Sequence, residues 1–293
     1  MVTPSYGNED FDFGFTVNDP RTHSLNLFND TRKQSNALKI LVDPGHGGKD
    51  LGAQGFFSVL EKSIALTIGK MVVRELEKSS KYQPLNRPIE VRLTRESDQF
   101  LSLKDRVKIA NVWNADLFVS IHANSSQFPR VRGFEVYFLN AEATDEQARK
   151  LAHIENDGLS MPLKNDVLSI LSDVQTNNHI NESSHFAENV FSSMATRAIT
   201  LARAVRQGPF TVLHGTTMPA ILIEVGYVTN VEDALNLSKD SYLKRLSNAI
   251  SVGILDYVRK PNAESIGWKK TQRIAPPQSN AALSQSSSGK LPY

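Results

Sequence analysis

The sequence predicts an α/β fold in which a mostly parallel, twisted sheet is covered by helices on both faces. Short apolar runs alternate with longer segments whose apolar residues recur at helical spacing, over most of residues 37–259. Strands that alternate with helices form parallel sheets, because each helix carries the chain back before the next strand begins. The hydrophobic fraction of 40% is sufficient to fill the core of one single domain.

The individual elements follow one another in a regular order. Apolar or alternating runs predict strands at residues 38–42, 89–93, 115–121, 134–139, 210–213 and 220–223. Helical periodicity predicts helices at residues 61–78, 102–114, 185–206 and 240–258. In such sheets ligands bind at the carboxyl ends of the strands, so residues that carry chemistry should directly follow the strand-like runs.

Three further segments differ from this pattern. Residues 1–36 are polar and lack periodicity, which predicts an extended or disordered arm. Residues 260–293 are rich in Pro, Ser, Asn and Gln, which predicts a flexible tail. Residues 143–184 resemble an insertion, and the sequence NDVLSILSDVQTNN within them predicts an amphipathic helix that begins at Asp166.

Composition excludes several classes of function. The formal net charge of +2 comes without a dominant basic block, so no nucleic-acid partner is predicted. The absence of cysteine excludes thiolate metal sites, disulfides and cysteine nucleophiles, so any metal must be held by histidine and carboxylate. No run of about 18 apolar residues predicts a transmembrane segment. The first residues also lack the basic start and apolar stretch of a signal peptide.

Four polar side chains occupy the positions where chemistry is expected. His46 follows the first strand within DPGHGG, His122 ends the strand ADLFVSI, and Glu224 ends the strand AILI. Glu61 stands at the start of the first helix. Each alone is an ordinary loop or helix-start residue, but two imidazoles and one carboxylate together form a three-ligand zinc site with one position open for water. The pattern therefore predicts His46, Glu61 and His122 as metal ligands and Glu224 as the catalytic acid and base.

The same segments resemble the zinc-dependent N-acetylmuramoyl-L-alanine amidases of the type 3 family. The resemblance runs from about residue 39 to about residue 258 and is carried by ILVDPGHGGKDLGAQG, RLTRESDQFLSLKDRVKIAN, ADLFVSIHAN, GFEVYF and MPAILIEVGYVTN. It implies a doubly wound sheet and the same four residue roles. It also implies hydrolysis of the amide bond between N-acetylmuramic acid and L-alanine in peptidoglycan, in the periplasm or elsewhere in the cell envelope, with the export signal removed.

The resemblance extends to the subgroup of these amidases that acts in cell wall remodelling and daughter-cell separation. In that subgroup a helix in the region of residues 143–184 covers the active site until an activator protein displaces it. For this chain it implies a regulatory helix at about residues 158–182 and an acidic side chain at the open zinc position. The candidates for that side chain are Glu155, Asp157, Asp166, Glu182 and Glu188.

Two other functions fit the same residues. A zinc D,D-carboxypeptidase or endopeptidase acting on the peptide stem would use identical metal chemistry. A non-catalytic wall-binding module would share the fold, although it would not need Glu224. The products of wall digestion separate these alternatives, because an amidase releases peptides that start with L-alanine.

Overall fold

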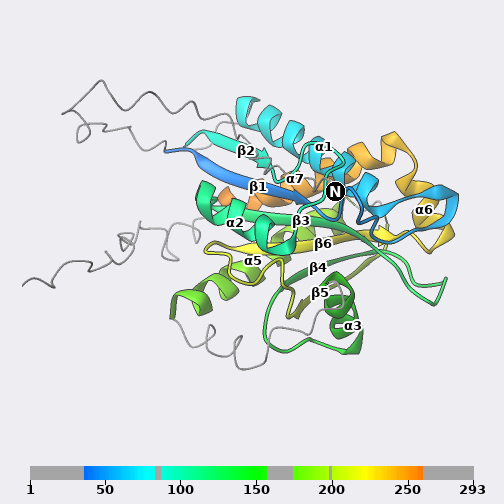
Figure 1. Ribbon diagram of the computed structural model, residues 1–293. Coiled ribbons are helices and arrows are strands. Elements are labelled where there is room, and N and C mark those ends of the chain that lie inside the picture. The colour runs from blue at the N-terminus through cyan, green and yellow to red at the C-terminus, as the bar shows by residue number, and fades with distance from the viewer. Residues whose placement is uncertain (1–35, 83–86, 157–173, 198–199, 260–293) are drawn as a thin grey trace, which may run out of the picture. The chain divides into compact units, whose positions relative to one another are not determined.

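A six-stranded sheet runs through the part of the chain that the computed structural model describes, namely residues 36–82, 87–156, 174–197 and 200–259. The strand order is β2-β1-β3-β6-β4-β5, and every neighbouring pair is parallel except β4 and β6. This confirms the predicted mostly parallel sheet (Figure 1). The strands are β1 (Leu38–Pro44), β2 (Ile89–Leu93), β3 (Leu117–Asn124), β4 (Phe134–Leu139), β5 (Ala202–Gly208) and β6 (Ala220–Tyr227).

Helices cover both faces of this sheet, as the sequence predicts. One buried cluster joins the sheet to α1, α5 and α7, and a second cluster on the other face joins it to α2 and α3. The helices are α1 (Glu61–Tyr82), α2 (Leu103–Trp113), α3 (Glu146–Glu155), α5 (Val174–Thr196), α6 (Val231–Leu237) and α7 (Asp240–Arg259), with a short 3₁₀ turn, η1 (Phe56–Ser58). None of the helices described is long and apolar enough to cross a membrane.

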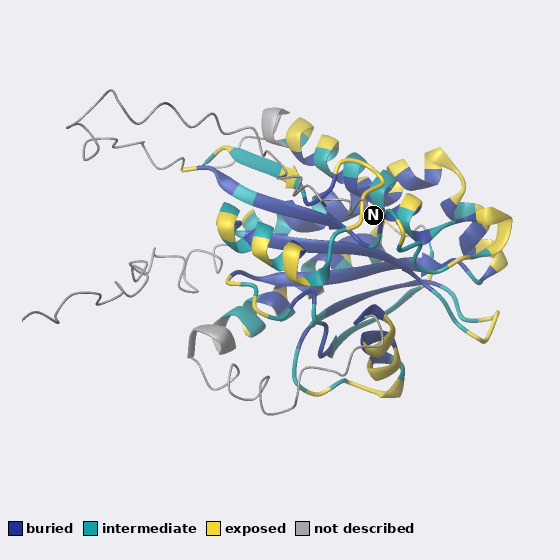
Figure 2. Cartoon of the chain, viewed as in Figure 1, coloured by how far each residue is buried: buried dark blue, intermediate teal, exposed yellow. Residues whose placement is uncertain are grey.

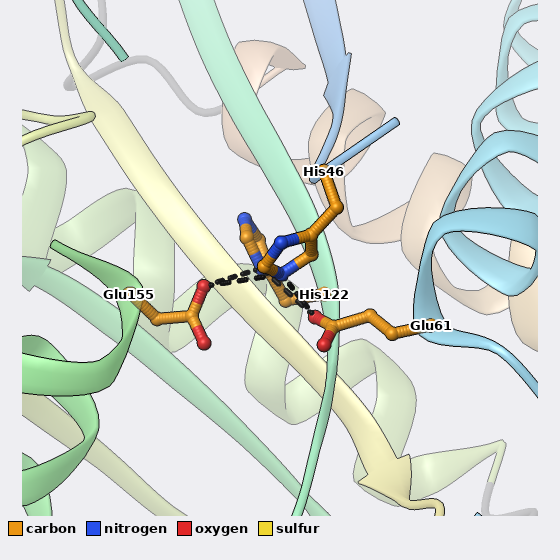
Figure 3. A group of neighbouring side chains, drawn as sticks. All are labelled: His46, Glu61, His122 and Glu155. Carbon is orange, nitrogen blue, oxygen red and sulfur yellow. Dashed lines mark hydrogen bonds and ion pairs between the residues drawn. The ribbon is translucent and has the colours of Figure 1, made fainter. Parts of the chain in front are cut away.

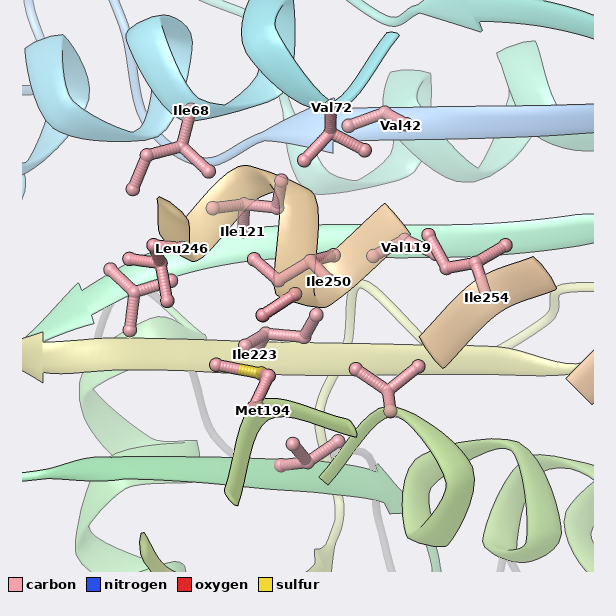
Figure 4. Packing of buried hydrophobic residues seen from close by; sticks show 14 of the residues in the cluster. Val42, Ile68, Val72, Val119, Ile121, Met194, Ile223, Leu246, Ile250 and Ile254 are labelled. Carbon is pink, nitrogen blue, oxygen red and sulfur yellow. The ribbon is translucent and has the colours of Figure 1, made fainter. Parts of the chain in front are cut away.

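The two clusters follow from the alternation of side chains along each strand. In β3, Val119 and Ile121 join the cluster beneath α1 and α7, whereas Phe118 joins the cluster beneath α2 and α3. Figure 4 shows the first cluster, where Ile250 of α7 lies among side chains of the sheet. Because both faces of β3 and β6 are covered, every residue of these strands is buried (Figure 2). That burial explains why they appear in the sequence as nearly continuous apolar runs.

Two predicted elements near residue 200 are wrong. The predicted helix at 185–206 ends at Thr196, and its last part is the strand β5. This strand lies at the sheet edge and is only half-buried. It therefore contains arginines, and its mixture of polar and apolar residues resembles the sequence pattern of a surface helix. The predicted strand at 210–213 is a turn instead. Its residues are apolar because Phe210 and its neighbours pack in the second cluster.

The predicted segments differ in how far the structure covers them. The arm at 1–36, except its last residue, and the tail at 260–293 lie outside the described residues. The predicted insertion contains α3 and the beginning of α5. The amphipathic helix predicted within it falls mostly on residues 157–173, which are also outside the described part. The short helix α6 was not expected from the sequence.

A buried ion pair connects α2 to the end of β1. Asp43 is fully buried and accepts hydrogen bonds from Thr94 Oγ1 at 2.6 Å, Arg106 Nη1 at 2.8 Å and Ser120 Oγ at 2.9 Å. Burial acts to raise the pKa of the Asp43 carboxyl, but the Arg106 charge and these hydrogen bonds hold it below its usual range. The strand end that precedes His46 is therefore fixed by a fully paired carboxylate.

Replacement of Arg106 tests how much this pair contributes. Arg106→Met should lower the free energy of unfolding by about 3–5 kcal/mol, because Asp43 would be left as a buried charge without its cation. The measurement is urea-induced unfolding followed by circular dichroism. Arg149→Met, which removes an exposed arginine from α3, is the matched control and should have little effect. A loss under about 1 kcal/mol for Arg106→Met would contradict this account.

Candidate metal centre

Three predicted ligands meet at one point near the carboxyl ends of the strands. His46 follows β1, Glu61 is the first residue of α1, and His122 lies near the end of β3. A fourth side chain, Glu155 at the end of α3, joins them. Each of the four offers one ligand atom, and these atoms all lie within 4.8 Å of one another (Figure 3). The prediction that both histidines lie near enough to share one ion therefore fits the structure.

The spacing of the donor atoms suits a single small cation. Glu61 Oε1 lies 3.0 Å from His46 Nε2 and 3.0 Å from His122 Nδ1. Glu155 Oε2 lies 2.8 Å from His122 Nδ1 and 3.4 Å from His46 Nε2. Ligands on a tetrahedral zinc ion, with bonds of 2.0–2.1 Å, are separated by roughly 3.3 Å. The four carboxylate–imidazole distances in the cluster, 2.8–3.4 Å, are therefore close to the spacing of ligands on such an ion.

The polar atoms of the cluster are incompletely satisfied by protein groups. Among the described residues, neither His46 Nε2 nor Glu155 Oε2 has a hydrogen-bond partner, although both are buried. Both atoms lie within ion-pair distance of the cluster but make no hydrogen bond to the described residues, so their lone pairs are available to a cation. The donor set of two imidazoles and two carboxylates is one that zinc accepts. The residues present therefore fit a zinc ion.

Electrostatics in the cluster indicate the same need for positive charge. Burial acts to lower the pKa of His122, but the carboxylates of Glu155 and Glu61 raise it to about 10. They likewise raise the pKa of His46, against the effect of burial. Burial acts to raise the pKa of Glu61, and the two imidazoles hold it below its usual range. Two buried carboxylates thus require compensating positive charge, which protonated imidazoles or a bound cation can supply.

The neighbours of His46 and Glu61 fix how these side chains point. His46 Nδ1 lies 2.8 Å from Asp50 Oδ2, and a hydrogen bond from Nδ1 to this carboxylate leaves Nε2 as the ligand atom. Glu61 Oε2 accepts from the Ala53 amide at 2.7 Å, and its Oε1 accepts from the Ala123 amide at 3.0 Å. Asp50 is a functional residue that the sequence analysis missed. Its position four residues after His46 was the available signal.

Two arginines hold the loop that carries His46. Arg95 donates to the carbonyls of Pro44 at 2.9 Å and Gly45 at 2.7 Å. Arg106 donates to the carbonyls of Pro44 at 2.7 Å and His46 at 2.8 Å. His46 itself has a left-handed backbone with a φ of 55°, which is uncommon outside glycine. A Cβ on Gly45 would stand 2.4 Å from the His122 ring, so only glycine fits there.

Glu224 lies beside the cluster but is not one of the four converging ligands. It is paired with His122 across β3 and β6 and is fully buried. Neither of its carboxyl oxygens has a hydrogen-bond partner among the described residues. Burial raises the pKa of Glu224 well above its usual range, and the negative charge of Glu155 raises it further. An unpaired carboxyl group next to a metal-binding cluster can accept and return a proton.

A second buried carboxylate, Glu135, pairs with Glu224 from the opposite strand, β4. It is neutralised by Arg203, whose Nε donates at 2.8 Å, and by a contact with Arg206. The hydroxyl groups of Tyr137 and Tyr227 also donate to it, at 2.9 and 2.8 Å. Glu135 is thus fully paired, which leaves Glu224 as the carboxyl group that is available for proton transfer.

The structure describes three of the five acidic residues that are candidates for the open zinc position. Glu155 lies in the cluster. Glu182 and Glu188 lie instead near His179 and His185 on α5, at 3.2 and 3.8 Å. The other two, Asp157 and Asp166, fall outside the described residues.

Comparison with known proteins gives a consistent result. The N-acetylmuramoyl-L-alanine amidase family matches residues 40–256. The chain is 32% identical to N-acetylmuramoyl-L-alanine amidase AmiA of Salmonella typhimurium, over 78% of each chain. Among solved structures, it resembles amidase AmiC2 of Nostoc punctiforme with a TM-score of 0.58 and 33% identity, over 76% of this chain and 98% of that one.

A further solved structure, the CwlD amidase from Clostridioides difficile in complex with the GerS lipoprotein, is similar with a TM-score of 0.55 and 25% identity. It covers 75% of this chain and 98% of that one. The family match spans about three quarters of this chain, and its range includes His46, Glu61, His122 and Glu224. This protein belongs to the N-acetylmuramoyl-L-alanine amidase family.

Proposed function

We propose that this protein is a zinc-dependent hydrolase that cleaves the amide bond between N-acetylmuramic acid and L-alanine in peptidoglycan. The observation that carries the proposal is the convergence of His46, Glu61 and His122 beside the unpaired carboxyl group of Glu224. Three ligands with a carboxyl group nearby form the arrangement that metal-assisted amide hydrolysis requires. Membership of the amidase family supports this choice over a D,D-carboxypeptidase, an endopeptidase or a non-catalytic wall-binding module.

Each residue has one role in this mechanism. His46, Glu61 and His122 would hold the ion, and Asp50 orients His46. When bound, the ion would lower the pKa of a water molecule and polarise the scissile carbonyl. Glu224 accepts a proton from that water and returns it to the nitrogen as the carbon–nitrogen bond breaks. The products are a carboxylic acid on the lactyl group and a free amine on L-alanine.

Glu155 blocks this chemistry in the described conformation. Its carboxylate takes the fourth position about the cluster, which a water molecule and the substrate carbonyl would need. Its negative charge also raises the pKa of Glu224, so withdrawal of Glu155 would favour the ionised, proton-accepting form of Glu224. We infer that the enzyme inhibits itself through Glu155. An activator protein would displace the regulatory segment at about residues 158–182, which begins just after α3.

The domain organisation and location of the protein follow as part of the same proposal. Residues 37–259 form the catalytic domain with 143–184 as the regulatory insertion, between an N-terminal arm at 1–36 and a tail at 260–293. Peptidoglycan lies outside the inner membrane, so the protein would act in the periplasm or elsewhere in the cell envelope. The activity would serve cell wall remodelling or daughter-cell separation.

Loss of one ligand tests the metal site and the bond that is cut. His122→Ala should contain substoichiometric zinc and should not digest purified cell wall, because only one imidazole ligand would remain beside the carboxylates. Elemental analysis measures the metal, and mass spectrometry of the digest should show peptides that begin with L-alanine for the unmodified protein only. Exposed His153 of α3 offers the control, since His153→Ala should retain both properties. Products cut within the peptide stem would refute the amidase assignment.

A change at Glu224 tests the acid and base separately from the metal. Glu224→Gln should lower kcat/KM for wall digestion by about 10²–10⁴-fold with normal zinc content, because the amide cannot accept the proton. Dye release from labelled cell wall measures the rate. Full activity in this variant would mean that another group transfers the proton.

If Glu155 inhibits the enzyme, replacement of Glu155 should increase the activity. Glu155→Gln should digest wall several-fold faster than the unmodified protein in the absence of an activator, because the amide is a poorer occupant of the zinc position. Glu146→Gln, at the exposed start of the same helix, is the control and should change nothing. Deletion of residues 158–182 should also raise activity in a protein that remains folded. Equal or lower activity of Glu155→Gln, with zinc retained, would argue against the mechanism.

A further inference from the structure

Exposed hydrophobic side chains gather around three segments next to the metal centre. Among the described residues, nine large hydrophobic side chains are exposed, and five of them belong to η1, to the loop between β3 and β4, and to α6. They are Phe56, Phe57, Phe128, Val231 and Leu235, and we call them the aromatic rim. Within the aromatic rim, Phe57 and Phe128 are the most accessible residues, with exposed fractions of 59% and 72%. Exposed apolar groups that gather in one place generally mark a binding surface.

Hydrogen bonds anchor these segments to one stretch of chain after β6. The Phe56 amide donates to the Val228 carbonyl at 3.0 Å. From the β3–β4 loop, the Ser126 amide donates to Thr229 Oγ1 at 2.8 Å, and the Pro129 carbonyl accepts from Asn230 Nδ2 at 2.7 Å. Figure 1 shows α6, the loop after β3 and the chain before α1 at the same end of the sheet. The aromatic rim is therefore one structural unit.

The aromatic rim is also continuous with the metal centre. η1 ends three residues before Glu61, the β3–β4 loop directly follows the strand of His122, and α6 follows the strand of Glu224. The Ala53 amide, three residues before η1, holds Glu61 Oε2 at 2.7 Å. A long polymer that is bound at the metal centre must extend away from it over the surrounding surface. The aromatic rim is one part of that surface, and it is apolar.

The strained backbone at Phe57 indicates that the surrounding structure holds this residue in place. Phe57 and Ser58 both have left-handed backbones, with φ values of 58° and 57°. Such a conformation costs about 1–2 kcal/mol for each residue other than glycine. The strained turn nevertheless presents a phenyl ring to solvent, where it gains no burial. Strain kept at an exposed position commonly accompanies a functional contact.

We propose that the aromatic rim binds the glycan strand of the substrate, with the rings of Phe57 and Phe128 stacked against sugar rings. A pyranose ring has an apolar face of C–H groups, which suits a phenyl ring, and a polar edge. Arg130 and Arg132 of the same loop supply polar contacts beside the rings. This inference rests on the proposed function, because it identifies the polymer that extends from the scissile amide.

The charge of the aromatic rim favours a glycan over an anionic lipid surface. Arg132 forms an ion pair with Glu232, so the loop lacks the cluster of several basic residues that anionic headgroups attract. A surface without excess positive charge gains little from anionic headgroups. N-acetylated sugars carry no charge and need none on the protein.

The test measures sugar binding apart from catalysis. Full-length protein is titrated with a hexamer of β-1,4-linked N-acetylglucosamine, which has no amide bond for the enzyme to cleave at a lactyl group. Phe57→Asn combined with Phe128→Asn should weaken binding about tenfold, since two aromatic contacts are removed. Asparagine tolerates the left-handed backbone, so Phe57→Asn alone repeats the test with the least disturbance of folding. Val112→Asn, at an exposed position on α2, is the control.

Cleavage of a single muramoyl peptide distinguishes the two proposals. The double variant should cleave it within about twofold of the normal rate, because one sugar makes no use of an extended stacking surface. No binding of the hexamer by the unmodified protein, or equal binding by the double variant, would overturn the glycan proposal. Loss of binding to phospholipid vesicles with normal hexamer binding would overturn it in favour of a membrane. Normal hexamer binding without cleavage of the muramoyl peptide, even by Glu155→Gln protein, would instead refute the proposed amidase function.

Discussion

Three buried carboxyl groups share a small volume with two imidazoles, and this crowding governs the rest of the site. Glu61, Glu155 and Glu224 come from α1, α3 and β6, and each is at least nine-tenths buried. Anions that are removed from water must gain a cation or a proton. The cluster favours a positive charge on the histidines and a proton on Glu224, since burial and the neighbouring charges raise the pKa of all three groups. A divalent cation would meet it while leaving the imidazoles neutral.

The scaffold around this cluster is polar for a related reason. The buried carbonyls at the start of the loop after β1 need hydrogen-bond donors. Arg95 and Arg106 supply them, and the pair between Arg106 and Asp43 keeps the second arginine in position. The loop can then hold His46 in a left-handed conformation that would otherwise be unfavourable. Rigid support of this kind keeps ligand atoms at metal distances without a contribution from the ion.

Glu155 connects the site to the proposed regulatory insertion. It is the last residue of α3, whose Ala148, Leu151 and Ala152 pack in the second core cluster. The carboxylate is thus carried into the site on a helix that is docked through a few apolar side chains. Movement of this helix would therefore free the fourth ligand position of the cluster and remove a negative charge from the vicinity of Glu224. The aromatic rim belongs to other elements and would remain available for a polymer in either state.

The sequence by itself determined the order of most strands and helices and four of the five side chains at the centre. It did so because covered parallel strands are continuously apolar and place chemistry at their ends, as His122 and Glu224 illustrate. Local pattern failed at residues 200–213, where an edge strand contains arginines and a buried turn is apolar. Only the tertiary structure distinguished Glu155 from Glu182 and Glu188, placed Asp50 beside His46 and brought the segments of the aromatic rim together. These features arise where segments that are distant in the chain pack together. The residue pattern within a single segment does not predict contacts of this kind.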